Sequence, residues 1–188
     1  NKNKLPKILM LSGKKGIGKF TLINHFLYNI FLKKEYDLNN NLILDNNFFY
    51  SKYKESTFPN IIYLSGAEFK NIKIDDIRNL KSILSKSTIS DSDRFVILDD
   101  VELFNKNSLN ALLKIIEEPT NKNYFILINN KTRPVLETII SRSLEFKISI
   151  SNKRRIEIIE NLIKIKKLNI KIDYTKIFVT PGNFLVFN

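Results

Sequence analysis

The sequence predicts an α/β fold in which helices cover both faces of a parallel sheet. Three observations lead to this prediction. Short apolar segments alternate with segments of helical periodicity along most of the chain. Several of the apolar segments are hydrophobic on successive residues, as are strands buried on both faces. A glycine-rich turn also lies between the first apolar segment and the first helical one, which is the setting of a phosphate-binding loop.

Five segments are expected to form the strands, and they span residues 7–12, 61–65, 95–100, 124–129 and 144–148. Between them, helical spacing relates three sets of apolar residues: Phe20, Ile23, Leu27, Ile30 and Phe31; Ile77, Leu80 and Leu84; and Leu109, Leu112, Leu113 and Ile116. Pro119 is expected to close the last of these helices. The segment 33–60 is expected to be a loop-rich insertion with a strand at 42–44.

From Ser151 the pattern changes, and no further central strand is expected. Ser151 is placed as the N-cap of a helix that carries Ile156 and Ile159 on one face. The stretch "TPGNF" at 180–184 is expected to make a turn and to open a last helix. We therefore predict a P-loop domain over residues 1–150 and a small helical domain over 151–188.

The composition is that of a globular chain that needs no covalent or metal staple. With 188 residues it suits one domain, or one domain with a small appendage. It has no cysteine and one histidine, His25, so we expect neither disulfides nor zinc. No apolar run approaches the roughly 18 residues of a membrane span, and "NKNKLPKILM" leads straight into the loop motif. We therefore expect a cytoplasmic protein with no membrane partner.

The formal net charge of +12 favours a nucleic acid or an acidic protein surface as a partner. A second interpretation has equal weight, because the chain is rich in Lys, Asn and Ile. An AT-rich genome would produce that bias without any selection for DNA binding. The basic run "KRR" at 153–155 is expected to be a solvated helix start.

The stretch "SGKKGIGKF" at 12–20 is nearly the phosphate-binding loop G-x-x-x-x-G-K-[ST]. In such a loop, backbone N–H groups surround phosphates at a helix N-terminus, and the lysine reaches the terminal phosphates. Phe20 stands where the motif needs a hydroxyl for Mg²⁺, and Thr21 could supply one only through a shift of the loop. The alternative is a glycine-rich turn with no ligand. The candidate cofactor-binding residues are Gly13, Gly16, Ile17, Gly18, Lys19, Phe20 and Thr21.

The segment "RFVILDDVELF" at 94–104 places two carboxylates, Asp99 and Asp100, after a buried strand. An Asp at the carboxyl end of a strand beside a phosphate loop can hold Mg²⁺. The alternative is an Asp that caps the helix after a strand, which is common by itself. Because the loop is also present, we favour the nucleotide-site interpretation for both carboxylates.

Three further segments carry a resemblance to a known family: "NALLKIIEEPT" at 110–120, "FILINN" at 125–130 and "TIISRS" at 138–143. Over most of residues 5–188 the chain resembles the delta prime subunits of the bacterial DNA polymerase III clamp loader, which are AAA+ proteins. The resemblance implies an AAA+ P-loop domain, with three αβα layers around a five-stranded parallel sheet, followed by a helical lid. It also implies a helical collar domain, which is absent from these 188 residues.

The partners that the resemblance implies are the gamma/tau and delta subunits, in a hetero-pentameric ring, together with the sliding clamp. Primed DNA is implied as a partner through the whole complex. In the family an arginine of the "SRS" segment leaves its own subunit and reaches the nucleotide of the neighbour, which makes Arg142 a candidate arginine finger. The alternative for Arg142 is an ion pair with a local carboxylate such as Glu145.

Several positions depart from the pattern of the family's ATPases. Phe20 replaces the loop hydroxyl, Asp100 replaces the Glu that polarises the attacking water, and Leu185 replaces the Arg of the lid. Asp is one methylene shorter than Glu, and about 1 Å of misplacement can cost roughly 10²-fold in rate. Asn129 and Asn130 fall at the sensor position, often a Thr, and could still form a hydrogen bond with a phosphate. These changes predict weak or vestigial ATP binding and no turnover.

The favoured hypothesis is therefore a delta-prime-like subunit that helps to load the sliding clamp onto primed DNA without hydrolysing ATP itself. One alternative is a gamma/tau-type ATPase of the same loader, which would need the hydroxyl that Phe20 lacks. The other is a P-loop hydrolase or kinase that acts alone, and it leaves "NALLKIIEEP" and "SRS" unexplained.

Overall fold

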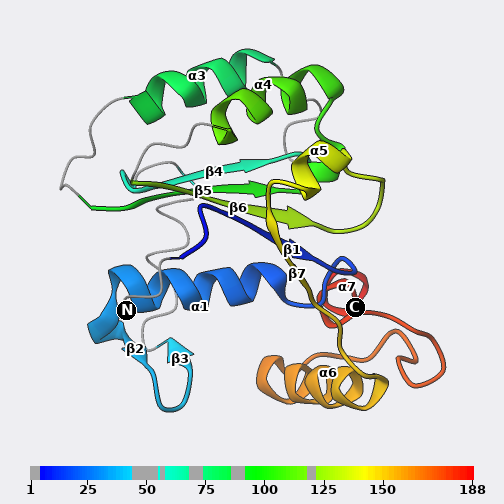
Figure 1. Cartoon of the computed structure of the whole chain (residues 1–188). Helices are drawn as coiled ribbons and strands as arrows, with labels where there is room; N and C mark the ends of the chain where they lie inside the picture. Colours follow the sequence, from blue (N-terminus) through cyan, green and yellow to red (C-terminus); the bar gives the residue numbers. More distant parts are fainter. Residues whose placement is uncertain (1–4, 44–54, 56–57, 68–73, 86–91, 118–121) are drawn as a thin grey trace.

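Figure 1 shows the computed structural model of the chain, in which a parallel sheet lies between two helical layers. The structure describes residues 5–43, 55, 58–67, 74–85, 92–117 and 122–188. The sheet has five strands in the order β4-β5-β6-β1-β7, and every neighbouring pair is parallel. The α/β fold class predicted from the sequence is confirmed.

The five strands are β1 (Ile8–Ser12), β4 (Ile61–Ser65), β5 (Arg94–Asp99), β6 (Asn123–Asn129) and β7 (Leu144–Lys147). Each end lies within a single residue of the sequence-based expectation. The insertion contains a short antiparallel pair of β2 (Tyr36–Asp37) and β3 (Leu42–Ile43), preceded by the 3-10 turn η1 (Lys33–Glu35). The sequence predicted β3 but not β2, and residue 44 of the expected strand lies outside the described residues.

The helices are α1 (Lys19–Phe31), α3 (Ile74–Ser85), α4 (Lys106–Ile116), α5 (Glu137–Ile140), α6 (Asn152–Lys166) and α7 (Pro181–Phe187), with a 3-10 turn η2 at Val101–Leu103. In Figure 1, α3, α4 and α5 cover one face of the sheet, and α1 covers the other. Helices α6 and α7 lie beyond the carboxyl ends of the strands, on the α1 side. The layers are therefore those of the expected αβα arrangement.

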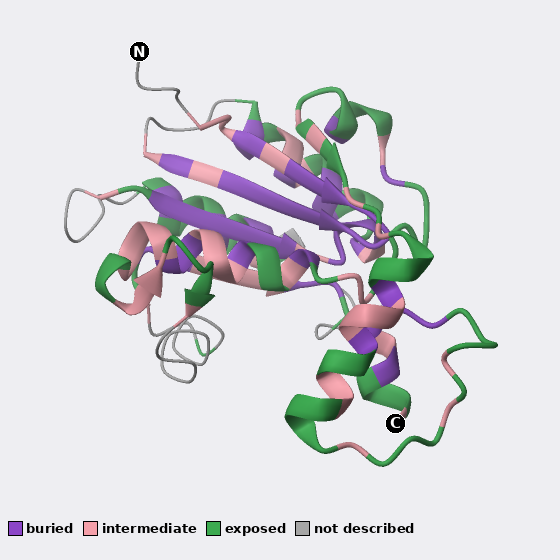
Figure 2. Cartoon of the chain, turned by 90° about the horizontal axis from the view of Figure 1, so that it is seen from below, coloured by how far each residue is buried: buried purple, intermediate pink, exposed green. Residues whose placement is uncertain are grey.

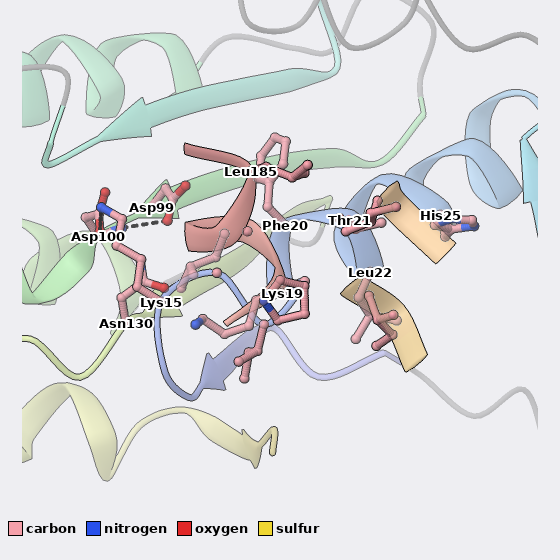
Figure 3. A pocket seen from close by; sticks show the side chains of 18 residues that line it. Lys15, Lys19, Phe20, Thr21, Leu22, His25, Asp99, Asp100, Asn130 and Leu185 are labelled. Atoms are coloured by element: carbon pink, nitrogen blue, oxygen red, sulfur yellow. Dashed lines mark hydrogen bonds and ion pairs between the residues drawn. The ribbon is translucent and has the colours of Figure 1, made fainter. Parts of the chain in front are cut away.

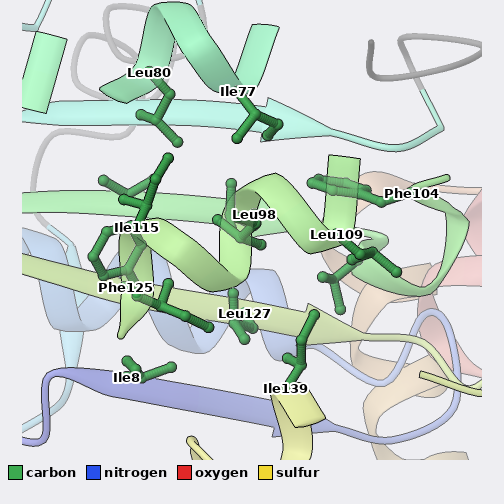
Figure 4. Packing of buried hydrophobic residues seen from close by; sticks show 14 of the residues in the cluster. Ile8, Ile77, Leu80, Leu98, Phe104, Leu109, Ile115, Phe125, Leu127 and Ile139 are labelled. Carbon is green, nitrogen blue, oxygen red and sulfur yellow. The ribbon is translucent and has the colours of Figure 1, made fainter. Parts of the chain in front are cut away.

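The strands that were apolar on successive residues supply both hydrophobic cores. Along β5, Val96 and Leu98 point into the core beneath α3 and α4, whereas Phe95 and Ile97 point into the core beneath α1. The same alternation runs along β1 and β6, as the twofold side-chain period of a strand requires. Figure 4 shows the first core, a cluster to which Ile77 and Leu80 of α3 and Leu98 of β5 belong. Burial on both faces fixes the register of the central strands.

The C-terminal helices form a third, smaller cluster around Ile159, Val179 and Phe184. Ser151 caps α6 by accepting a hydrogen bond from the backbone N–H of Arg154, and Pro181 is the first residue of α7, as the sequence predicted. Figure 2 shows that this part is more exposed than the sheet. The division of the chain at residue 150 remains a prediction.

One expectation for this region is wrong, because the run "KRR" is not wholly solvated. The Arg155 side chain is 2% exposed. Its guanidinium donates hydrogen bonds to the side chain of Asn152 and to the carbonyls of Tyr174 and Val179. Burial is tolerated because these acceptors replace water. Arg155 thus ties the segment before α7 to the first turn of α6.

Candidate functional site at the phosphate loop

Three candidate segments meet because they follow parallel strands at the same edge of the sheet. Ser12 at the end of β1 lies opposite Asn129 at the end of β6. Leu98, next to the end of β5, lies opposite Leu127 of β6. The carboxyl ends of the three strands therefore bring together the loop after β1, the acid pair after β5 and the asparagines after β6.

The loop has the backbone shape of a phosphate-binding loop. Gly16 and Gly18 have φ angles of 81° and 96°, a left-handed conformation that side-chain-bearing residues rarely adopt. Helix α1 begins immediately afterwards, at Lys19. The Lys19 Nζ atom donates to the loop's own carbonyls, at 2.7 Å from Gly13 O and 2.9 Å from Lys14 O. Burial lowers the pKa of Lys19 to about 8, although nearby carboxylates oppose the shift.

The Asp99 side chain accepts hydrogen bonds from a tyrosine hydroxyl and from a backbone N–H. The Tyr63 hydroxyl of β4 donates to its Oδ2 at 3.1 Å, and the Asp100 backbone N–H donates to its Oδ1 at 2.8 Å. Burial, and then the charge of Asp100, raise the pKa of Asp99 above its usual value. Sequence reasoning missed Tyr63, because its approach to Asp99 depends on how β4 pairs with β5.

Asp100 follows with a left-handed backbone, at a φ of 50°, and is 4% exposed. Its Oδ1 accepts a hydrogen bond from Asn130 Nδ2 at 2.8 Å and lies 3.4 Å from the ammonium of Lys15. Figure 3 shows Lys15 and Asn130 beside the acid pair. The carboxylate therefore joins the loop after β1 to the segment after β6.

The structure distinguishes the two adjacent asparagines. Asn130 lines the pocket and contacts Asp100, whereas the Asn129 side chain accepts a hydrogen bond from the backbone N–H of Lys131. The Asn129 carbonyl accepts from Gly13 N–H at 3.1 Å, so Asn129 supports the loop through its backbone. Which asparagine faces the pocket depends on the turn at Lys131, where φ is 56°.

Glu102 of η2 is a second residue that sequence reasoning missed. It is 5% exposed, and its Oε1 accepts hydrogen bonds from the Asn130 backbone N–H at 3.1 Å and from the Thr132 hydroxyl at 2.9 Å. Glu102 therefore fixes the backbone from which Asn130 reaches Asp100. The "VELF" segment gave only a weak signal, because an isolated Glu after a strand is usually solvated.

Phe20 occupies the position of the expected hydroxyl and packs against Tyr63, with ring centroids 5.7 Å apart in an edge-on arrangement. Thr21, the next residue, is exposed and lines the same pocket. A Mg²⁺ ion at this point would need oxygen ligands and near-octahedral space. The motif's hydroxyl ligand is replaced by an aromatic ring, and Asp99 already accepts a hydrogen bond from the Tyr63 hydroxyl. Among the residues that the structure describes, no group of three His, Cys, Asp or Glu side chains could hold a metal.

The pocket beside the loop has a volume of about 640 Å³. Its floor is the segment from Lys15 to Leu22, and Asp99, Asp100 and Asn130 line one side. Apolar side chains of α6 and α7 close it, namely Ile158, Leu162, Pro181 and Leu185. The expected lid position, Leu185, therefore does face the loop but offers no charge to an anion.

The start of α7 touches the phosphate loop directly. The Thr180 hydroxyl donates to Lys15 O and the Gly182 N–H donates to Gly16 O, both at 2.7 Å. A Cβ atom on Gly182 would lie 2.8 Å from the Gly16 Cα atom, so the two glycines allow backbones to pack against each other. The loop is thus a packing surface for α7 as well as a potential anion site.

Arg142 does not line this pocket. It lies in the turn between α5 and β7, where its Nη2 is 3.0 Å from Glu117 Oε1 and its Nη1 donates to Thr138 O at 3.0 Å. Its side chain is 40% exposed. The ion pair is therefore made with the end of α4 rather than with Glu145, the carboxylate proposed from the sequence.

Comparison with known proteins decides the family. Residues 1–166 match the family model described as DNA polymerase III, delta subunit. The chain belongs to this family. Family membership fits the loop-bearing site on a five-stranded parallel sheet, and it agrees with the resemblance carried by "NALLKIIEEPT" and "TIISRS".

Curated relatives include both gamma and delta' subunits of DNA polymerase III. DNA polymerase III subunit gamma of Buchnera aphidicola from Acyrthosiphon pisum is 28% identical over 150 residues, which cover 78% of this chain and 39% of that protein. DNA polymerase III subunit delta' of Pseudomonas aeruginosa is 32% identical over 90 residues, covering 47% of this chain and 27% of that protein. The matches thus span well under half of either relative.

Two solved structures show the same fold. A DNA polymerase III gamma subunit-related protein of Thermotoga maritima superimposes with a TM-score of 0.55 at 21% identity, covering 86% of this chain and 49% of its own. A RuvB variant of Thermotoga maritima superimposes with a TM-score of 0.53 at 19% identity, covering 96% and 52%. At these identities the comparison supports the fold of this DNA polymerase III family member, and the roles of its residues rest on its own geometry.

Proposed function

We propose that the chain is a delta-prime-type subunit of a DNA polymerase III clamp loader that does not hydrolyse ATP itself. The observation that carries this proposal is the altered Mg²⁺ position. Phe20 packs against Tyr63, and the Tyr63 hydroxyl holds Asp99, the carboxylate that would otherwise face the cation. Without Mg²⁺ the charge of a triphosphate is not neutralised, so any ATP binding at Gly13 to Lys19 is weak or vestigial.

In this proposal the chain acts as an assembly subunit. Its partners are the gamma/tau and delta subunits of a hetero-pentameric ring, which places the sliding clamp on primed DNA. Relatives named as subunits delta', gamma and tau of DNA polymerase III support a place in this complex. Residues 151–188 would serve as the helical lid, and a collar domain would complete the full-length subunit.

The first test is ATP hydrolysis by the purified chain. We expect no Mg²⁺-dependent turnover above that of the Lys19→Ala variant, which lacks the ammonium of the loop. A rate of a few per second that disappears in Lys19→Ala would instead support a gamma/tau-type ATPase. That alternative has one observation in its favour, because the match to the subunit gamma of Buchnera aphidicola extends over 150 residues.

The second part of the proposal assigns Arg142 to a neighbouring subunit, as an arginine finger. Its exposed guanidinium, outside the chain's own pocket, supports this role. A permanently charged fork can bind two phosphate oxygens, and a finger supplied in trans is worth roughly 10³–10⁵ in rate at the site that it serves. The Arg142–Glu117 pair lies on the surface, where ion pairs contribute little to stability, so a structural role does not account for Arg142.

We expect Arg142→Ala to leave the folding of the subunit nearly unchanged while slowing clamp loading by the reconstituted ring. The loss for the whole ring should be smaller than at the single site, because other sites carry their own fingers. Arg142→Lys should rescue poorly, since it keeps the charge and loses the fork. The measurements are thermal unfolding of the subunit and the loading rate of the ring. If rings with Arg142→Ala load clamps at the normal rate, Arg142 is not an arginine finger and only forms the local ion pair with Glu117.

A further inference from the structure

We propose that Glu117 is a positioning residue that orients the Arg142 guanidinium before the neighbouring subunit binds. This inference rests on the proposed finger role of Arg142. Glu117 Oε1 lies 3.0 Å from Arg142 Nη2, and Thr138 O accepts from Nη1 at the same distance. Two acceptors on different elements thus hold the two terminal nitrogens of one planar group.

These contacts leave several N–H donors of the guanidinium available for a phosphate. An arginine side chain has five N–H donors in a fixed fork. The carboxylate and the carbonyl engage one donor on each terminal nitrogen, so a donor on each of them, and the Nε–H, are available for phosphate oxygens. A side chain that is oriented beforehand loses less rotamer entropy when it binds.

Stability is a poor explanation for this ion pair. The two side chains are 40% and 47% exposed, and pairs of that exposure contribute little to folding. Glu117 is also the C-cap residue of α4, where a negative charge opposes the helix dipole. The Glu117 carboxylate thus stands in an electrostatically unfavourable place and adds little stability, and its contact with Arg142 is better explained by orientation of the guanidinium.

The support beneath Glu117 is rigid, whereas the support beneath Arg142 is a turn. Leu112, Ile115 and Ile116 anchor the last turns of α4 in the core, and the Glu117 backbone N–H donates to Leu113 O. Arg142 lies between the four-residue helix α5 and the edge strand β7. Sites built on regular elements are positioned more accurately than sites on turns. Glu117 therefore adds an acceptor fixed on α4 to the one that the segment of Arg142 supplies through Thr138 O.

The test compares rings that contain the full-length subunit with Glu117→Gln, Arg142→Ala or both substitutions. Pre-steady-state ATP hydrolysis and clamp loading are measured. Glu117→Gln should slow hydrolysis at the served site by about two- to tenfold, the factor for freeing one rotamer-rich side chain. The ATP concentration that half-saturates the ring should not change. In the Arg142→Ala background Glu117→Gln should have no further effect, and Glu117→Asp should recover part of the rate.

Glu137→Gln is the matched control, because Glu137 is an exposed carboxylate on α5 whose loss changes the charge equally. If Arg142→Ala slows the ring and Glu117→Gln does not, the positioning role is overturned while the finger stands. A Glu117→Gln effect that persists in the Arg142→Ala background also overturns it, since Glu117 would then act through α4. Normal rates in Arg142→Ala rings refute the finger itself.

Discussion

The ammonium of Lys19 is a charge that the folded loop accommodates at a cost. The side chain is 3% exposed, and its hydrogen bonds go to two carbonyls of the loop rather than to an anion. Burial lowers its pKa to about 8, whereas an unfolded chain keeps the lysine protonated until about pH 10.4. Between these values the unfolded state binds more protons than the folded state.

The free energy of unfolding should therefore rise with pH in this window, relative to a Lys19→Met variant in which the titrating group is missing. The slope should approach about 1.4 kcal/mol per pH unit between the two pKa values. Urea unfolding of both proteins at pH 7, 8, 9 and 10 provides the measurement, and the common contribution of other lysines and tyrosines cancels in the difference. A difference that stays constant from pH 7 to 10 would show that the Lys19 pKa is not lowered.

At the scale of elements, α7 is fixed to the phosphate loop through backbone contact. Gly182 →Ala would place a Cβ 2.8 Å from the Gly16 Cα atom, and neither backbone can move away cheaply. Alanine favours a helix more than glycine does, so propensity alone predicts stabilisation. We expect the clash to outweigh propensity and to destabilise the fold by about 1–3 kcal/mol, the usual cost of overpacking.

Val186→Ala is the comparison for that substitution, because Val186 lies on the same helix and is 78% exposed. It should change stability by less than about 0.5 kcal/mol. Denaturant unfolding of both variants measures the difference. A Gly182→Ala protein as stable as the wild type would mean that α7 can shift off the loop without loss.

The elements themselves were largely predictable, because their signals are local. The strands β5 and β6 were recognisable from successive apolar residues, and alternate side chains do fill the two cores. Ser151 and Pro181 marked helix starts correctly. Strand β2 was missed because two residues without alternating hydrophobicity leave no pattern to detect.

At the scale of the whole molecule, prediction failed where residues distant in sequence meet. The Tyr63 hydroxyl reaches Asp99 only because β4 pairs with β5, and Arg142 pairs with Glu117 only because α5 lies near the end of α4. The buried Arg155 is a similar case, since two of its three acceptors lie 19 and 24 residues along the chain. Sequence reasoning identified the loop and the acid pair, but not the partners that decide what they can bind.

The contact between Gly16 and Gly182 has a consequence for how this sequence can change over evolutionary time. The Gly16 carbonyl accepts from Gly182 N–H, and a Cβ on Gly16 would meet the Thr180 hydroxyl and the Asn183 backbone nitrogen. Substitution of Gly16 is therefore penalised by packing alone, whether or not a nucleotide ever binds. Selection on the packing of α7 against the loop can preserve a nucleotide-binding signature after its ligand is lost, so the persistence of such a signature in a genome is no measure of ATP use.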